Sequence, residues 1–136
     1  MAISGKDVNT GVKVLLVNDN QELAFVTGKL LGASGFQTQI CFSGQQCIEI
    51  SARTQPDVIL LDIDMPDIDG YTVCQYIRKQ TWGKKPFILA LSAHSEKSFI
   101  ERSYKAGFDR YLLLPVFHSE LSMVITDFVN KNKHAQ

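Results

Sequence analysis

The chain has 136 residues, of which 45% are apolar, and this is enough for one domain with its own hydrophobic core. Lysine plus arginine equals aspartate plus glutamate at 14 each, so no net charge attracts the chain to nucleic acid, and we expect no nucleic-acid partner for this chain alone. No apolar run reaches the ~18 residues that a membrane span needs, and no signal-peptide pattern precedes residue 12. We therefore expect no membrane association and a cytoplasmic location.

The three cysteines, Cys41, Cys47 and Cys74, are odd in number and lack C-x-x-C spacing. This pattern argues for a reducing compartment and against a disulfide framework or a zinc site. The three histidines have no mutual spacing that would bind a transition metal. We expect the cysteines to be thiols in the core or at its margin.

The chain is predicted to consist of a flexible leader or linker remnant over 1–11, one domain over 12–131 and a polar tail over 132–136. Short apolar or half-polar runs predict five strands, at 12–17, 38–42, 58–61, 87–91 and 111–113. Apolar residues at helical spacing predict a helix after each strand, around 23–31, 43–54, 73–77, 99–103 and 121–128.

This alternation of strands and helices predicts an α/β fold of the (βα)5 type. Right-handed crossovers then give a flavodoxin-like three-layer sandwich, with a parallel five-stranded sheet in the order 2-1-3-4-5. Gly35 and Gly107, each followed by phenylalanine, are predicted to terminate helices, and Ser43 is predicted to begin one.

Polar side chains follow three of the predicted strands where each strand ends. Asp19 follows the first strand, Asp62 follows the buried third strand, and Ser92 follows the fourth. In an open parallel sheet these strand ends share one edge, where such folds place their reacting groups. Two carboxylates that only partly fill a coordination sphere suit Mg²⁺, and a carboxylate beside the metal can act as a nucleophile toward a phosphoryl group.

With these residues in place, the sequence resembles the response-regulator receiver family from about residue 12 to residue 129. The segment Val17-Asn18-Asp19-Asn20 stands at the acidic pair of that family, and Asp62-x-x-Met-Pro-Asp-x-Asp-Gly70 at its phosphoacceptor loop. Ser92-Ala93 matches the hydroxyl position and Tyr111 the aromatic switch. The ordered set is far more specific than any one motif.

The segment from Trp82-Gly83 through Ala106-Gly107-Phe108-Asp109 to Pro115-Val116 is similar to receivers attached to hybrid sensor kinases. The resemblance implies that Asp62 accepts phosphate from a phosphohistidine on a histidine kinase or a histidine phosphotransfer domain. It also implies that Asp19, Asp62 and the backbone carbonyl of Asp64 hold Mg²⁺. Enzymatic activity is then at most self-phosphoryl transfer and autodephosphorylation at Asp62, and the chain is primarily a regulatory module.

By the same resemblance, Ser92 hydrogen-bonds the phosphoryl group while Tyr111 turns inward. The surface formed by the helix around 99–103, the strand at 111–113 and the helix around 121–128 then changes and carries the output. A homodimer through this face is a further implication. His94 and Asp64 lie two residues beyond Ser92 and Asp62, where they either tune access to phosphate or are merely exposed loop residues.

Two positions depart from the family pattern. Asn18 stands where the family has an acid, and Leu114 stands where it has a lysine before Pro115. A lysine contact to a phosphoryl group is of order 1.5 to 3 kcal/mol, so its loss predicts weakened switching. The two changes cancel in formal charge, and compensation and decay both remain open. We expect Leu114-Pro115 to be cis, as in receivers.

Simpler interpretations exist for each residue. Asp62 alone would be a solvated loop aspartate, Asp19 a helix cap, Ser92 a strand terminus and Tyr111 a core aromatic. Three function classes follow: a phosphate-accepting receiver, a phosphorylation-independent pseudo-receiver that binds a partner, and a small flavodoxin-like enzyme or cofactor binder. The third class fits worst, because the loop after the first strand lacks the glycines that a phosphate-bearing cofactor needs.

Overall fold

The computed structural model describes residues 11–134. The strands are β1 (Lys13–Val17), β2 (Gln37–Cys41), β3 (Val58–Asp62), β4 (Phe87–Ser92) and β5 (Arg110–Leu113). The helices are α2 (Gln21–Ala33), α3 (Gly44–Thr54), α4 (Gly70–Arg78), α5 (Lys97–Ala106) and α6 (His118–His134). All strand pairs are parallel and the sheet order is β2-β1-β3-β4-β5, which confirms the predicted fold class and topology.

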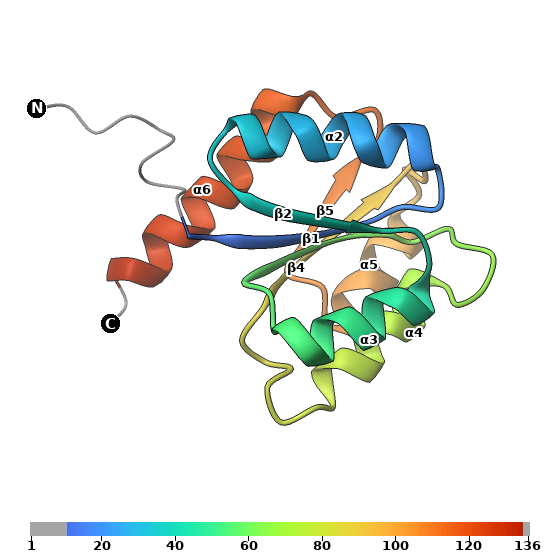
Figure 1. Cartoon of the computed structure of the whole chain (residues 1–136). Coiled ribbons are helices and arrows are strands. Elements are labelled where there is room, and N and C mark those ends of the chain that lie inside the picture. The colour runs from blue at the N-terminus through green and yellow to red at the C-terminus, as the bar shows by residue number, and fades with distance from the viewer. Residues whose placement is uncertain (1–10, 135–136) are drawn as a thin grey trace, which may run out of the picture.

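The sheet separates two layers of helices (Figure 1). Helices α2 and α6 lie on one face, and α3, α4 and α5 lie on the other. Because successive strand residues point to opposite faces, β3 contributes Ile59 and Leu61 to the core beneath α3 to α5, and Val58 and Leu60 to the core beneath α2 and α6. The central strand is apolar throughout because both of its faces are buried.

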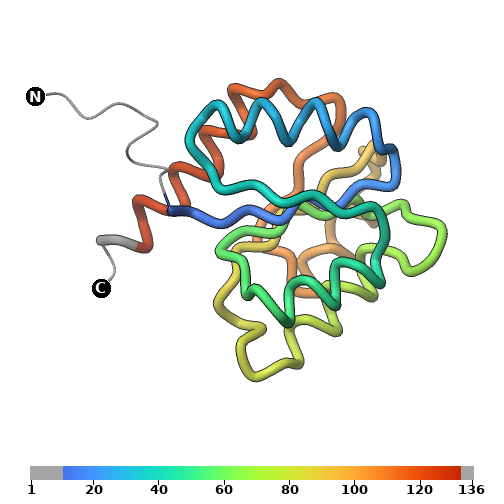
Figure 2. Tube along the Cα trace, viewed as in Figure 1, coloured from blue at the N-terminus to red at the C-terminus, as the bar shows by residue number. Residues whose placement is uncertain are grey.

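The strands all end at one edge of the sheet, where the chain turns into the loops that precede the helices (Figure 2). The register brings Val17 of β1 beside Leu61 of β3, and Asp62 beside Leu91 of β4. The residues that follow these positions therefore share one edge. This is the placement that the sequence predicts for Asp19, Asp62 and Ser92.

Local signals account for several helix ends. The Ser43 side chain accepts a hydrogen bond from the backbone N–H of Gln46 at the start of α3, as predicted. Gly35 and Gly107 follow α2 and α5 with positive φ of 100° and 112°, a conformation that glycine adopts without steric cost. The cap of α2 is Asn20, whose side chain accepts from the N–H of Leu23, so Asp19 is not needed in that role.

Other details differ from the predictions. The apolar stripe of α2 does not face the core as a whole: Leu31 is buried, but Leu23, Val26 and Leu30 are 42 to 57% exposed. The sequence predicts that the helix around 73–77 runs out near 81–83, whereas α4 ends at Arg78 and a hydrogen-bonded turn follows it through Gly83. Helix α6 continues to His134, past residue 131. Residues 1–10 of the predicted leader and 135–136 of the predicted tail lie outside the described residues.

The three cysteines are buried free thiols, as predicted. Burial raises the pKa of Cys41 and of Cys74 to about 12 and raises the pKa of Cys47 as well, so these thiols are unreactive at neutral pH. Within residues 11–134, no helix is both long and apolar enough to cross a membrane.

The Arg78 side chain, which is 18% exposed, fastens the edge of the sheet opposite the strand ends. Its guanidinium donates to the carbonyls of Gly83, Pro86 and Gly107 at 2.8 to 2.9 Å, and it pairs with the Asp109 carboxylate at 2.8 Å. That carboxylate also accepts the N–H of Ile88 at the start of β4. One cation thus ties α4 to the segments that begin β4 and β5.

We predict that Arg78→Met lowers the free energy of unfolding by about 3 kcal/mol, because it leaves three carbonyls and a carboxylate without their charged donor. Urea denaturation followed by circular dichroism measures this change. Arg53→Met, at an exposed position in the last turn of α3, is the matched control and should change stability little. Equal effects of the two substitutions would contradict this role for Arg78.

Candidate functional site

Asp62, the last residue of β3, is half-buried at the centre of the site. Its Oδ1 accepts the backbone N–H of Asp64 at 3.0 Å, and the loop closes where the N–H of Gly70 donates to the carbonyl of Ile63 at 2.9 Å. A Cβ at position 70 would lie 2.8 Å from the Asp62 carbonyl oxygen, so only glycine lets α4 begin this close to the strand end.

Two further aspartates shape this loop. Asp67 accepts hydrogen bonds from the N–H groups of Gly44 and Gln45 at 3.1 and 3.0 Å, which anchors the loop to the N-terminus of α3. Asp69 is the N-cap of α4 and accepts the N–H of Thr72 at 2.9 Å. Both carboxylates satisfy helix N-termini, so they define the loop without facing Asp62.

The loop after β1 brings Asn18 and Asp19 to the same edge. Asn18 is only 7% exposed, and its side-chain oxygen accepts the N–H of Asn20 at 2.9 Å. Asn18 therefore serves to close the turn. Asp19 is exposed and lies close enough to Asp62 for their carboxylates to interact.

The pKa of Asp62 is raised to about 6, mainly by burial and also by the neighbouring charges of Asp19 and Asp64, against the lowering effect of the Asp64 N–H. Two carboxylates held this close favour a shared proton or a cation. The oxygen atoms of Asp19, Asp62 and the Asp64 backbone are hard donors of the kind that Mg²⁺ takes. Over residues 11–134 no group of three histidine, cysteine, aspartate or glutamate side chains could hold a metal, so a site here needs backbone oxygen or water as well.

Ser92 and Tyr111 approach from the neighbouring strands. Ser92, at the end of β4, is 1% exposed, and its Oγ accepts the N–H of His94 at 3.1 Å. Tyr111, in β5, is half-buried against the core beneath α3 to α5, and its hydroxyl donates to the carbonyl of His94. The structure thus places the tyrosine with its ring directed inward.

His94 and Asp64 contact each other across the mouth of the site. His94 Nε2 lies 3.0 Å from Oδ2 and 3.2 Å from Oδ1 of Asp64, and the imidazole stacks on the ring of Phe99 with centroids 4.0 Å apart. The sequence indicated both residues as candidates at the mouth of the site. It did not indicate the pairing or the stack, because two loops and a helix bring the three side chains together.

Leu114 precedes a cis peptide bond to Pro115, which confirms the predicted isomer. Its side chain packs against the core beneath α2 and α6 and, with Asn18 and Ala93, lines an apolar groove between those helices. The exposed residues Leu23, Val26 and Leu30 of α2 also line this groove. At position 114 the side chain is therefore apolar and offers no hydrogen-bond donor.

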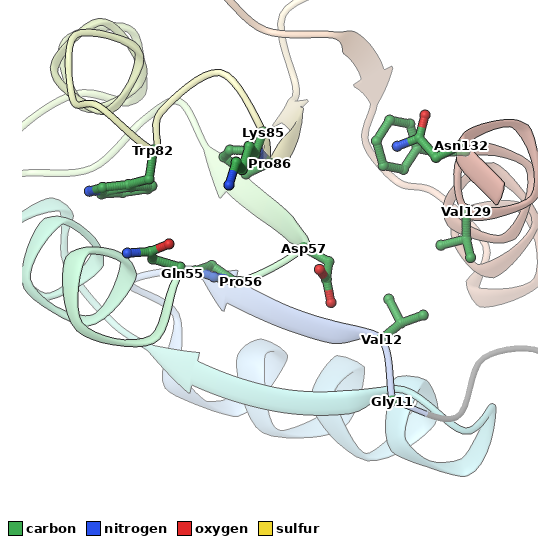
Figure 3. A pocket seen from close by; sticks show the side chains of 11 residues that line it. Gly11, Val12, Gln55, Pro56, Asp57, Trp82, Lys85, Pro86, Val129 and Asn132 are labelled. Atoms are coloured by element: carbon green, nitrogen blue, oxygen red, sulfur yellow. The ribbon is translucent and has the colours of Figure 1, made fainter. Parts of the chain in front are cut away.

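A second hollow lies at the opposite edge of the sheet (Figure 3). Its walls include Trp82, Pro86 and Asp57, with Asn132 on α6 facing them. Asp57 is already bonded to the N–H of Lys13 at 2.8 Å. None of the candidate site residues lines this hollow. Trp82 therefore lies near the beginnings of the strands, whereas Asp62 lies where β3 ends.

Residues 14–126 match the family model of the response regulator receiver domain. The chain belongs to this family. Among the relatives of this receiver, the peroxide stress-activated histidine kinase mak1 of Schizosaccharomyces pombe is 34% identical over 89% of the chain. The hybrid signal transduction histidine kinase D of Dictyostelium discoideum is 33% identical over 96% of the chain. The chain spans 8% and 9% of the length of these two kinases.

Solved structures agree with this assignment. The receiver domain of a sensor histidine kinase from Pseudomonas aeruginosa PAO1, described with a magnesium ion coordinated in the active site cleft, is 30% identical, with a TM-score of 0.82. The superposition covers 89% of this receiver and 99% of that one. A putative response regulator from Chloroflexus aurantiacus is 27% identical, with a TM-score of 0.81 over 87% of this receiver and 97% of that chain.

The sequence placed Asp67 and Asp69 in the phosphoacceptor loop, but it did not indicate their contacts or that of Phe99. The cap formed by Asp69 could have been found, because an aspartate directly before Gly70 and the apolar spacing of α4 is an N-cap signal. The contact of Asp67 could not, since its partner Gln45 lies 22 residues away. The stack of Phe99 on His94 could not either, because it depends on the path of the loop between the two residues.

The raised pKa of Asp62 in this receiver predicts a pH-dependent stability. The folded protein binds the proton more tightly than the unfolded chain does, so this carboxyl favours folding below about pH 4, and that contribution is lost as the pH rises through about 6. In metal-free buffer, Asp62→Asn should raise the free energy of unfolding by about 1 to 2 kcal/mol near pH 8, allowing for solvent screening, and by less near pH 4.

Urea denaturation of both proteins across this pH range, with a chelator present, measures the difference. Asp127→Asn, at an exposed carboxylate on α6, is the control and should show no pH-dependent gain. A gain from Asp62→Asn that does not vary with pH would show that desolvation of the carboxylate is not its cause.

Proposed function

We propose that this receiver accepts a phosphoryl group on Asp62 from a phosphohistidine of a histidine kinase or a histidine phosphotransfer domain. The observation that carries the proposal is the convergence of the Asp19 and Asp62 carboxylates with the Ser92 hydroxyl at one sheet edge. The kinship with receiver segments of histidine kinases supports the choice of donor.

In this reaction an Oδ of Asp62 attacks the phosphorus, the P–N bond to the donor histidine breaks, and that histidine keeps the electron pair and takes up a proton. The attacking carboxylate must be ionised, and a pKa of about 6 leaves Asp62 mostly ionised at neutral pH but protonated in mild acid. A cation at Asp19, Asp62 and the Asp64 backbone carbonyl would favour the ionised form and screen its charge from the phosphate. The hydroxyl of Ser92 is positioned to donate to a phosphoryl oxygen.

Output would leave through the surface of α5, β5 and α6. Tyr104, Leu113 and Phe117 expose 48, 49 and 81% of their surface there, and Tyr111 reaches that surface from the site. Large exposed apolar side chains suit a protein contact, and a homodimer through this face remains a prediction. The ring of Tyr111 is the link that we propose between Ser92 and this surface.

The proposal predicts that Mg²⁺ with beryllofluoride, a phosphoryl mimic, shifts the amide resonances of Asp62, Ser92 and residues 95–129. Amide shifts are the suitable readout because Trp82, the single tryptophan, lies at the opposite edge of the sheet. Asp62→Asn should abolish the response to beryllofluoride. Asp19→Asn should abolish most of the Mg²⁺ binding, because Asn18 brings no charge to replace it.

Glu22→Gln is the matched control for Asp19→Asn, since it removes one exposed carboxylate from the first turn of α2, outside the site. Its Mg²⁺ titration should match that of the unsubstituted protein. Unchanged metal affinity in Asp19→Asn, or no response of the unsubstituted protein to beryllofluoride, would favour the second candidate function.

That second candidate is a pseudo-receiver that binds a partner without phosphorylation. Its support is Leu114, which packs into the apolar core where the family has a lysine and so offers no donor to a phosphoryl group. The receiver could then accept a phosphoryl group on Asp62 and still fail to pass the change on to the surface of α5, β5 and α6. The proposed metal side keeps the carboxylates of Asp19 and Asp62, whereas the opposite side is apolar at Leu114.

We predict that Asn18→Asp combined with Leu114→Lys raises the response to beryllofluoride by more than the sum of the two single substitutions. The lysine alone is a cation without its acidic partner, and charges in contact within one site are not additive. The spread of amide shift changes over 95–129 in the four proteins measures the effect. A full response in the unsubstituted protein, with none added in the double variant, would show that Leu114 does not weaken switching.

A further inference from the structure

His94 has contacts to four separate parts of the site. Its imidazole reaches the loop after β3 through Asp64 at 3.0 Å and lies flat against Phe99 in α5, at an interplanar angle of 5°. Its backbone N–H donates to Ser92 Oγ, and its backbone carbonyl accepts the Tyr111 hydroxyl. One residue therefore joins the phosphoacceptor loop, the hydroxyl and the tyrosine.

The contacts of the ring fix its orientation. A carboxylate only accepts hydrogen bonds, so Nε2 must carry a hydrogen toward Asp64 whether the imidazole is neutral or charged. The stack on Phe99 defines the plane of the ring, and the backbone of Phe99 is itself held where its carbonyl accepts the hydroxyl of Tyr71 at 3.3 Å. Tyr71 is 3% exposed. The ring is thus fastened, through Phe99, to the buried core.

Because the ring is fixed, the backbone at residue 94 is fixed too, and with it the acceptor that holds Tyr111. The carbonyl and N–H of His94 belong to the loop between β4 and α5, and Ser92 ends the strand that enters this loop. If the ring contacts were lost, the hydrogen bond from the Tyr111 hydroxyl to the His94 carbonyl would remain, but the imidazole would no longer hold that carbonyl in place. The side chain of His94 then decides whether the acceptor of the tyrosine stays in place.

We propose that His94 is a positioning residue that holds Tyr111 inward before any phosphoryl group arrives, by bonding Asp64 and stacking on Phe99. This inference rests on the proposed function, because it concerns how the same site sets its output surface. The surface of α5, β5 and α6 is then preset in the absence of phosphate. Phosphorylation then acts on a Tyr111 that is already directed inward. This gives a physical reason why the site can function with leucine at position 114, where the family has a lysine.

The test uses the whole chain in metal-free buffer without beryllofluoride. Ring resonances of Tyr111, assigned by loss in Tyr111→Phe, report the environment of the ring. The unsubstituted protein should give one set of signals typical of a buried ring. In His94→Ala these signals, and the amides of residues 110–113, should shift toward those of an exposed tyrosine. His94→Gln, whose amide can still donate to Asp64, should recover part of the shift.

Asp64→Ala removes the acceptor but keeps the backbone carbonyl, and it should move the Tyr111 signals in the same direction as His94→Ala. The two substitutions together should add little to His94→Ala alone, since both break the contact between Asp64 and His94. Glu96→Gln is the control: its carboxylate lies 4.0 Å from Nδ1 of His94, and its side chain makes no cap bond to α5. It should leave the Tyr111 signals unchanged.

Unchanged Tyr111 signals in His94→Ala, or shifts from His94→Ala and Asp64→Ala that add in full, would overturn the proposal. If His94→Ala does not fold, Asp64→Ala alone decides, because it substitutes an exposed loop side chain. The measurement needs neither metal nor phosphoryl mimic. Its failure therefore leaves the role of Asp62 intact, and a failure of the Mg²⁺ and beryllofluoride test leaves this one intact.

Discussion

The cost of burying the Asp62 carboxylate, with that of Asp19 beside it, organises the site. The parallel pairing of β1 with β3 carries Asp19 and Asp62 to one edge, and the buried apolar strand behind Asp62 removes much of the water that would screen them. Such an arrangement favours uptake of a proton or binding of a cation between the two carboxylates. The hydrogen bond from Asp64, the glycine at position 70 and the caps at Asp67 and Asp69 hold the loop in this otherwise unfavourable arrangement.

Much of the fold follows from the sequence because its signals are local. The unbroken apolar run of β3, the cap at Ser43 and the Leu114-Pro115 bond each depend on a few adjacent residues, and each was predicted. The site edge also followed, because strand order fixes which strand ends are neighbours. Periodicity failed on α2, where Leu23, Val26 and Leu30 share the helical spacing of a core face but remain exposed. Spacing alone cannot distinguish a face that packs inside from one left for a partner.

The contacts of Arg78 and of His94, which the sequence had indicated as a candidate, could not be predicted for a different reason. Each gathers partners from segments that are distant along the chain, and a single arginine or histidine carries no spacing that reveals them. The departures at Asn18 and Leu114 were visible in the sequence, but their physical setting was not. Asn18 closes a turn through its side-chain oxygen, and Leu114 joins an apolar core, so both positions have structural work that is independent of phosphate.

The sheet divides the interior into two cores that share no side chains, one beneath α3 to α5 and one beneath α2 and α6. Residues far apart with no common partners change independently, so a substitution in one core need not be matched in the other. Leu114 belongs to the second core, whereas the side chain of Tyr111 and the helices that anchor the phosphoacceptor loop belong to the first. Substitutions beneath α2 and α6, at Leu114 included, can therefore reshape that face while the packing behind the phosphoacceptor loop stays as it is.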